Sequence, residues 1–272
     1  MDIFLAVNKL NYKNNKIIFV IGLLLLMGLA IAGSRFSLFY YNPDSAQSNL
    51  GQLKTDVDML FTHNKNDVTF QAFSHFSDFD KQLRANRPIL AYVPHWYLQQ
   101  YGEELGLSPL LHSVRDDKTT YNKLLITNIS SSKKAGGLKD ASMAMTTLGP
   151  ESRSILNKVL FTEHNVNADT LSIVEVPKDT DAVFAVALGQ VDSALVSEAS
   201  LRRLEKRNPR LTAAVKIVAE TKPLALPILC YFDGTLDDAA LAELRKQFLN
   251  STPFKSKSIF SIFNIDTWRA QL

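Results

Sequence analysis

Residues 181–196 read DAVFAVALGQVDSALV, and they contain a helix, the end of that helix and the strand that follows it. The preceding stretch PKDT, residues 177–180, supplies residue types that begin helices. Gly189 ends the helix, and residues 191–196 form an apolar run short enough for a strand. A similar run, residues 171–176, comes before the helix. The stretch therefore predicts a strand–helix–strand unit, whose two strands lie parallel in one sheet.

The same alternation extends over most of the chain and predicts an α/β protein. Strands are expected at residues 36–41, 68–73, 89–93, 110–115, 121–127, 141–146, 171–176, 191–196, 215–219 and 227–232. Helices are expected at residues 46–62, 78–85, 94 to 102 or 106, 151–164, 181–188, 198–206 and 236–249. Strands that alternate with helices favour sheets that are mixed but mainly parallel.

The alternation occurs in two successive sets, which predicts two lobes with a cleft between them. The sets join near residues 117–121, and the chain crosses back near residues 219–222. Lobe 1 is therefore expected to contain residues 35–116 and 220–272, and lobe 2 residues 117–219. Closure of two such lobes around a ligand is a hinge motion.

An uncharged apolar run near the start of the chain predicts a membrane segment. Residues 17–33 read IIFVIGLLLLMGLAIAG. At a rise of about 1.5 Å per residue, this is close to the minimum length for crossing the bilayer core. Three lysines before the run and a single arginine after it favour a cytoplasmic N-terminus. We expect residues 1–16 to be a cytoplasmic segment and residues 17–34 to be one transmembrane helix.

The alternative is a cleaved signal peptide, because residues 30–32, Ala-Ile-Ala, fit a cleavage site. The long segment before the apolar run favours retention instead. Residues 31–34 are similar to a bacterial lipoprotein box in which Ser34 stands in place of the cysteine, so no thiol is present for acylation. The expected location is the inner membrane, with a single pass and the soluble domain in the periplasm; cleavage would release that domain into the periplasm.

Composition and missing motifs exclude several functions. The net charge is +3 over 272 residues with no long basic run, which argues against nucleic acid as a partner. Cys230 is the single cysteine and lies in an apolar run, so we expect a buried, inert thiol. The five histidines lack metal-ligand spacing, and no nucleophile elbow or phosphate-binding loop is present. We therefore expect neither an enzyme nor a metal or cofactor site.

Candidate binding residues follow from the positions where strands end or where the chain crosses between the lobes. In open α/β sheets, ligands lie beyond the carboxyl ends of the strands, where helix N-termini present hydroxyls and backbone N–H groups. The residues expected to face the cleft are Tyr41, Ser74, His95, Trp96, Tyr121, Thr147 and Lys178. Lys178 is the expected positive partner of an anion, and Trp96 is expected to cover an apolar part of the solute. Each hydroxyl also fits an ordinary helix cap, and Trp96 also fits packing under a loop.

Residues 79–83, FDKQL, and residues 89–97, ILAYVPHWY, resemble a segment of the phosphate- and phosphonate-binding periplasmic proteins, the substrate-binding components of ABC importers. The likeness continues at residues 114–116, at Tyr121, at residues 137–140 and at residues 181–196, and it covers about residues 36–249. The resemblance implies a type 2 periplasmic-binding-protein fold, a small anionic ligand of the phosphate or phosphonate kind, and an ABC permease or a sensor as partner.

One stretch departs from the family pattern. The family carries a loop rich in serine and threonine at the start of the second lobe's first helix, and its hydroxyls and amides hold the phosphonate oxygens. Here residues 146–153 read TTLGPESR, so Pro150 lacks an N–H and Glu151 is an anion where an anion should bind. The family's histidine before residues 181–183 appears as Lys178 or Asp179. The alternative hypothesis is a degenerate scaffold without ligand, serving as an accessory or structural subunit of an inner-membrane complex.

Overall fold

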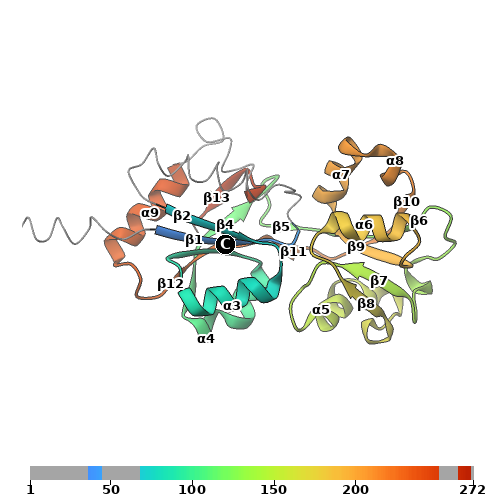
Figure 1. The fold of residues 1–272 in the computed structure, drawn as a ribbon, viewed down its shortest axis with the longest axis horizontal. Coiled ribbons are helices and arrows are strands. Elements are labelled where there is room, and N and C mark those ends of the chain that lie inside the picture. The colour runs from blue at the N-terminus through green and yellow to red at the C-terminus, as the bar shows by residue number, and fades with distance from the viewer. Residues whose placement is uncertain (1–35, 45–67, 251–262, 271–272) are drawn as a thin grey trace, which may run out of the picture. The chain divides into compact units, whose positions relative to one another are not determined.

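The computed structural model describes residues 36–44, 68–250 and 263–270. The apolar run at residues 17–33 and the helix expected at residues 46–62 lie outside the described residues. Within these described ranges, no helix is long and apolar enough to cross a membrane. The described part forms two α/β lobes, each built on its own sheet (Figure 1).

Lobe 1 is built on a six-stranded sheet with the strand order β13-β4-β12-β3-β1-β2. In chain order its strands are β1 (Phe36–Tyr41), β2 (Val68–Phe73), β3 (Leu90–Val93), β4 (Leu107–Val114), β12 (Ile228–Phe232) and β13 (Thr267–Arg269). Its helices are α3 (Phe76–Asn86), α4 (His95–Leu105) and α9 (Asp238–Asn250). The C-terminal elements β12, α9 and β13 therefore return to the lobe that contains β1.

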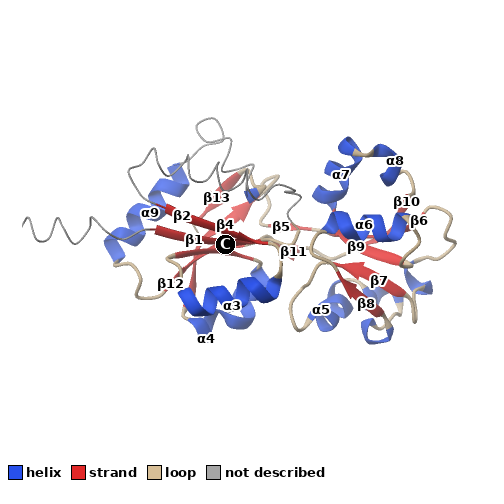
Figure 2. Cartoon of the chain, in the orientation of Figure 1, coloured by secondary structure: helices blue, strands red, loops and turns tan. Residues whose placement is uncertain are grey.

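Lobe 2 is built on a five-stranded sheet with the order β10-β6-β9-β7-β8. Its strands are β6 (Lys123–Asn128), β7 (Ser142–Met145), β8 (Ser172–Glu175), β9 (Ser193–Ser197) and β10 (Val215–Glu220). Its α-helices are α5 (Ser152–Val159), α6 (Asp179–Ala187), α7 (Glu198–Arg207) and α8 (Pro209–Thr212). Strands of this lobe lie between layers of helix (Figure 2).

The lobe 1 core is aromatic on both faces of its sheet. On one face Phe79 of α3 and Tyr97 of α4 are fully buried, with ring centroids 5.2 Å apart. Phe79 also stacks on Tyr41 of β1 at 4.9 Å. On the opposite face Tyr92 of β3 meets Phe263 at 4.6 Å. Each aromatic ring buries about 150–250 Å², so these contacts hold α3, α4 and the C-terminal segment on the sheet.

The lobe 2 core follows the alternation of side chains along β7. Met143 and Met145 pack with Leu156 of α5 on one face of the sheet. Ala144 between them packs with Val183 of α6 on the other face. Residues of a strand alternate between the two faces, and apolar residues of a helix recur every three or four positions. The sequence pattern therefore accounts for a sheet covered by helices on both sides.

Both sheets mix parallel and antiparallel ladders. The pairs β1–β3, β7–β8 and β7–β9 are parallel, whereas β12 with β3 and β4, β13 with β4, and β6 with β9 and β10 are antiparallel. The expectation of mainly parallel sheets is therefore wrong for the ladders that the structure describes. The reason is that β6 and β12 each start directly after a crossing between the lobes, so they run away from the cleft. Strands of βα units instead end at the cleft.

The two crossings pair with each other. β5 (Thr120–Tyr121) and β11 (Leu224–Ala225) form a two-stranded antiparallel ladder in which Tyr121 lies opposite Leu224. The Leu226 amide donates to the Thr119 carbonyl at 2.8 Å next to this ladder. The ladder strand of the first crossing, Thr120–Tyr121, lies within residues 117–121, and that of the second crossing, Leu224–Ala225, follows residues 219–222. Two short strands thus connect the lobes, which is the arrangement expected of a hinge.

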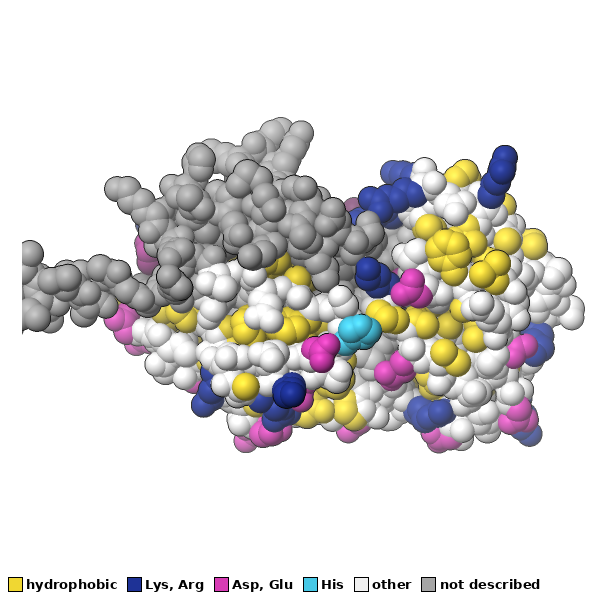
Figure 3. Space-filling view, in the orientation of Figure 1, with side chains coloured by type: hydrophobic (Ala, Val, Ile, Leu, Met, Phe, Trp, Pro, Cys, Tyr) yellow, Lys and Arg dark blue, Asp and Glu magenta, His cyan; other side chains and the backbone are white. Residues whose placement is uncertain are grey.

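The outer surface of lobe 2 carries exposed apolar side chains near α6 and α8 (Figure 3). Phe184 on α6 is 40% exposed and Leu188, which follows the helix, is 67% exposed. Val183 and Val186 on the same helix are buried. α6 therefore packs one apolar side on the sheet and also presents apolar residues to the surface.

Candidate functional site

The two lobes are bonded to each other at Asp44, which follows β1. The Asp44 amide donates to the Asn42 side-chain oxygen at 3.2 Å, a local turn typical of Asn-Pro-Asp sequences. The Asp44 carboxylate then reaches into lobe 2. Its Oδ1 accepts from Lys123 Nζ and from Thr146 Oγ1, each at 2.7 Å, and its Oδ2 accepts from the Tyr121 hydroxyl. One carboxylate of lobe 1 thus binds three donors contributed by lobe 2 and the first crossing.

Lys123 is the central cation of this cluster and is fully buried. It is the first residue of β6, and its Nζ lies 3.5 Å from Asp179 Oδ1 in addition to its contact with Asp44. Burial lowers the pKa of the Lys123 ammonium, but the carboxylates of Asp179 and Asp44 outweigh burial, so the pKa is raised. Lys123 is therefore charged at neutral pH and requires both neighbours, because an unpaired buried charge is costly.

The two carboxyl groups beside Lys123 have opposite pKa shifts. Burial raises the Asp44 pKa, but Lys123 together with the hydroxyls of Tyr121 and Thr146 outweighs burial and lowers it. For Asp179 burial is the larger effect, and its pKa is raised. Asp179 Oδ2 accepts from the amide and hydroxyl of Ser197, whereas its buried Oδ1 has no hydrogen-bond partner among the described residues. Asp179 therefore takes up a proton before Asp44 does as the pH falls.

A cavity of about 290 Å³ lies beside Asp44 in the cleft between the lobes. Its walls come from α4 in lobe 1, from α5 in lobe 2 and from both crossings. Asp44 and Tyr121 line this cavity, whereas Lys123 and Thr146 lie behind them and do not. The Asp44 carboxylate therefore separates the cavity from the buried ammonium.

Trp96 closes one side of this cavity by packing on Gly149. The Gly149 backbone has φ +89°, and a Cβ atom there would lie 2.5 Å from Trp96 Cε3. Glycine is needed at this position both for its backbone angle and for the close approach of the indole ring. His95 and Gln99 line the cavity from α4. Burial lowers the His95 pKa, and its hydrogen bond with Gln99 opposes that shift.

Backbone amides of the loop that leads into α5 donate hydrogen bonds to side chains of the same loop. The Leu148 amide donates to Ser152 Oγ at 3.1 Å, and the Gly149 amide donates to Thr147 Oγ1 at 3.1 Å. Pro150 has no N–H, and the Ser152 amide donates to the Gly149 carbonyl at 3.0 Å. These amides are therefore not directed at a ligand, in agreement with the sequence departure from the family's phosphonate-binding loop.

The structure brings together three of the seven predicted site residues: His95, Trp96 and Tyr121 line the 290 Å³ cavity. Tyr41 is 2% exposed and belongs to the aromatic core, although Asp44 lies near enough to contribute to the raised pKa of its hydroxyl, after burial. Thr147 is buried and bonded within its own loop.

Lys178 and Ser74, the other two, are partly exposed and line neither described cavity. Lys178 is the N-cap residue of α6 and makes no side-chain capping bond. That any of the seven contacts a ligand remains a prediction.

Three central residues were not predicted: Asp44, Lys123 and Thr146. A signal was present for Lys123, because it stands between Tyr121 and the apolar run LLIT, where a charge needs a buried partner. Asp44 and Thr146 lie next to strand ends that the sequence did identify. No pattern in the sequence shows that these two residues, 102 positions apart, meet.

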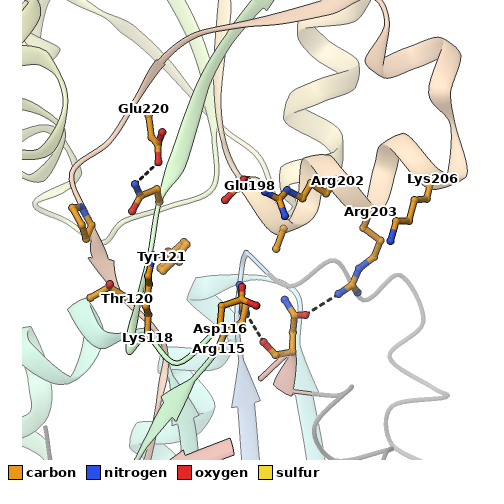
Figure 4. A pocket seen from close by; sticks show the side chains of 14 residues that line it. Arg115, Asp116, Lys118, Thr120, Tyr121, Glu198, Arg202, Arg203, Lys206 and Glu220 are labelled. Atoms are coloured by element: carbon orange, nitrogen blue, oxygen red, sulfur yellow. Dashed lines mark hydrogen bonds and ion pairs between the residues drawn. The ribbon is translucent and has the colours of Figure 1, made fainter. Parts of the chain in front are cut away.

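A second, larger cavity of about 570 Å³ lies beside the crossings on the side of α7 (Figure 4). Its basic residues are Arg115, Lys118, Arg202, Arg203 and Lys206, and its acidic residues are Asp116, Glu198 and Glu220. Tyr121 and Pro223, both at crossings, line this cavity and the smaller one alike. The crossings therefore lie between the cluster of Asp44, Lys123 and Asp179 on one side and this mainly basic cavity on the other.

Two α/β lobes that meet at a cleft and are joined by two short crossings define the class of periplasmic binding proteins. The sequence gives the family. A protein-family model described as ABC transporter, phosphonate, periplasmic substrate-binding protein matches residues 39–271. The chain therefore belongs to the family of periplasmic substrate-binding proteins of phosphonate ABC transporters, as the resemblance predicted. No curated protein sequence matches the chain.

Solved structures share the fold at low sequence identity. A binding-protein component of an ABC phosphonate transporter from Pseudomonas aeruginosa is 15% identical with a TM-score of 0.71, over 87% of this chain and 81% of that one. PhnD1 from Prochlorococcus marinus, in complex with methylphosphonate, is 14% identical with a TM-score of 0.72, over 87% and 92%. A protein from Xanthomonas citri bound to ATP is 15% identical with a TM-score of 0.66, over 88% and 92%. At these identities the likeness shows the two-lobed fold alone.

Proposed function

We propose that this chain is a solute-binding protein for a small phosphate- or phosphonate-like anion, tethered to the inner membrane with its lobes in the periplasm. The lobes close on the solute, and the closed form delivers it to an ABC permease or is sensed by a partner. The observation that carries the proposal is the set of donors around the Asp44 carboxylate. Family membership supports the transport role.

The donor set has the chemistry that an oxyanion requires. Lys123 supplies an ammonium group, and Thr146 and Tyr121 supply hydroxyls, all directed at the two oxygens of one carboxylate. The oxygens of a phosphonate accept the same bonds, and hydrogen bonds between charged groups are roughly twice as strong as neutral ones. Because Asp44 stands between the cavity and Lys123, the solute anion reaches these donors by replacing the Asp44 carboxylate.

The 290 Å³ cavity accommodates the remainder of the solute. It is near the lower end of the usual range for ligand pockets, about 300–1,000 Å³. Trp96 and the apolar side chains of Leu148 and Ile155 line it, which suits a short alkyl substituent. Methylphosphonate, the compound bound by PhnD1 from Prochlorococcus marinus, is therefore the first probe to use.

The membrane tether is supported by the sequence alone. Residues 17–33 are uncharged and apolar, and the lysines before them favour an N-terminus on the cytoplasmic side. A retained helix would keep the two lobes close to a permease or other inner-membrane partner. The mass of the intact protein from membranes tests this part: a mature chain that begins at Gly33 would show cleavage.

The second candidate function is a ligand-free accessory subunit of an inner-membrane complex. One observation favours it: the Asp44 carboxylate already accepts hydrogen bonds from Lys123, Thr146 and Tyr121, so the lobes are joined without a solute. The loop before α5 likewise bonds its own amides. In this alternative the Asp44 contacts are purely structural.

Calorimetric titration of the full chain with methylphosphonate and orthophosphate distinguishes the two functions. We expect binding by the parent protein and a loss of at least about tenfold in affinity for Lys123→Gln, since a charge-assisted hydrogen bond contributes about 1.5–3 kcal/mol. Lys178→Gln is the matched control, because it removes the same charge near α6 but outside both cavities. Asp44→Asn is expected to bind more tightly, because a neutral amide competes less for Lys123.

Thermal denaturation of each variant shows whether it is folded. A ligand at 100 times its dissociation constant should stabilise the folded chain by about 2.7 kcal/mol. The solute-binding proposal is wrong if neither the parent nor Asp44→Asn responds to any of these anions while both still copurify with a membrane complex. That outcome would support the accessory-subunit function.

A further inference from the structure

The larger cavity collects cations from both lobes. Arg115 follows β4 of lobe 1, whereas Arg202, Arg203 and Lys206 come from α7 of lobe 2 (Figure 4). Five basic and three acidic side chains line the cavity. The function proposed above uses none of these basic side chains.

Arg115 and Arg203 both donate hydrogen bonds to Asn264, whose carbonyl and side-chain oxygens are neutral acceptors. Arg115 Nε donates to the Asn264 carbonyl at 2.7 Å, and Arg203 Nη2 donates to Asn264 Oδ1 at 3.0 Å. Within the described ranges, no carboxylate forms an ion pair with either guanidinium. Burial lowers the Arg203 pKa, and the positive charges of Arg207 and Arg115 lower it further. Two like charges are thus held close together, and no carboxylate of the described residues is paired with either of them.

The acidic residues of the cavity do not supply the missing charge. Glu198 pairs with Arg202 on the same helix at an exposed position. Glu220 accepts from the side-chain amide of Asn122. Asp116 is exposed. The cavity therefore keeps an excess of positive charge that is directed into a hollow between the lobes.

We propose that this cavity is a second binding site, for a compound with two or more linked phosphate groups. One phosphate fits between Arg115 and Arg203, whose planar guanidinium groups bind oxyanions through two parallel N–H donors. Lys206 follows Arg203 by three residues, on the same side of α7 and about one turn further along. It reaches the next phosphate in the chain. A ligand bound in this way bridges the two lobes.

The shape of the site favours a small molecule over a protein segment. Its volume of about 570 Å³ lies within the usual range for small ligands, about 300–1,000 Å³. The cations line a hollow, whereas an acidic peptide would need a longer basic groove. A single phosphate engages only the two arginines, so affinity should rise with the number of linked phosphates.

Calorimetry with the full chain tests the proposal with inorganic tripolyphosphate, ATP and orthophosphate as probes. We expect tripolyphosphate to bind more tightly than orthophosphate, with an affinity that falls as salt is added. Lys206→Gln and Arg203→Gln should each weaken tripolyphosphate by about tenfold or more. Arg210→Gln is the matched control: it removes one exposed charge from the neighbouring helix α8, outside the cavity. Lys206 is exposed, so its variant should fold as the parent does.

Comparison of ATP with tripolyphosphate identifies the source of the phosphates. Equal affinities support an inorganic polyphosphate site, and tighter binding of ATP supports a nucleotide site. The proposal is overturned if tripolyphosphate does not bind, or if Arg210→Gln weakens it as much as Lys206→Gln does. Methylphosphonate titration of Arg203→Gln separates this site from the function proposed above, because Arg203 lines only the larger cavity. The variant should bind methylphosphonate as the parent does, and tripolyphosphate binding by the parent does not depend on whether the solute site binds an anion.

Discussion

Both cavities at the crossings have cations beside them, but the surroundings of those cations differ. Behind the wall of the smaller cavity, Lys123 is fully buried and lies beside two carboxyl groups, Asp44 at 2.7 Å and Asp179 at 3.5 Å. In the larger one, Arg115 and Arg203 share neutral acceptors on Asn264. The first charge is compensated by carboxylates within the fold, whereas the described residues offer the second pair no carboxylate.

The difference follows from burial. An ammonium that is sealed from water requires an anion, so Lys123 must be paired for lobe 2 to fold. Arg203 is only partly buried, and solvent stabilises its charge. A positive residue near a cleft is thus already paired with carboxylates in one place, whereas in the other no carboxylate of the described residues pairs with it. The predictions below test this comparison, from the largest expected effect to the smallest.

Replacement of Lys123 by methionine should cause the largest loss of stability. Methionine keeps most of the buried volume but leaves Asp44 and Asp179 without their cation. Breaking a buried pair on one side costs about 3–5 kcal/mol. Urea denaturation measures the loss, and Lys178→Met, at a partly exposed position, is the control with an expected change within about 0.5 kcal/mol. Equal effects of the two substitutions would show that the central cluster contributes no special stability.

Gly149→Ala should destabilise the wall of the smaller cavity by about 1–3 kcal/mol. The added Cβ would lie 2.5 Å from the Trp96 ring, on a backbone with φ +89°. Gly137→Ala is the matched control, because a Cβ there meets no atom within 4 Å. Thermal unfolding compares the two. A Gly149→Ala protein as stable as the control would contradict the close packing of Trp96 on this loop.

Asp44→Asn should lower the free energy of unfolding by about 1.5–3 kcal/mol at pH 7, the usual value for hydrogen bonds to a charged group. The folded-state pKa of Asp44 lies below its ordinary value of 3.8. Its carboxylate therefore stabilises the fold above that ordinary pKa, and the stabilisation is lost as the pH falls through the folded-state pKa. The difference between parent and variant should thus shrink below about pH 4. A difference that is constant from pH 7 to pH 3 would contradict an ionic role for Asp44.

Lys206→Gln should have the smallest effect on the protein alone, within about 0.5 kcal/mol, because the side chain is exposed and makes no described ion pair. Its effect should appear only when tripolyphosphate is added, as a smaller rise in melting temperature than the parent shows. Identical melting curves for parent and variant at every tripolyphosphate concentration would show that the larger cavity does not use its cations for binding.

Much of the fold could be predicted from local patterns. The helix at residues 181–188 is observed as α6, Asp179–Ala187, and the strand at residues 191–196 as β9, Ser193–Ser197. The prediction of two lobes is confirmed, because β4 and β8 belong to different sheets. Strand direction was predicted less well. Periodicity shows that a segment is a strand, but only its entry point, from a crossing or from a helix, gives its direction.

The candidate site could be predicted only in part. Strand ends identified His95 and Trp96 because an α/β fold places such positions at one edge of its sheet, whereas Tyr121 was identified by its place at the first crossing. The same rule selected Lys178, which lies one position before Asp179 and outside both cavities. It missed Lys123, because this residue begins a strand after a crossing instead of ending one. The rule therefore fails where the chain passes between the lobes.

The sequence by itself determined the order of helices and strands, the two-lobed class and the family, because these depend on spacing along the chain. It also determined that the loop before α5 lacks an amide at Pro150. Only the tertiary structure decided which charges meet. Asp44 and Lys123 are 79 positions apart, and their contact depends on how the two lobes close on each other. Electrostatic pairing depends on distance in space, and local sequence patterns do not encode it.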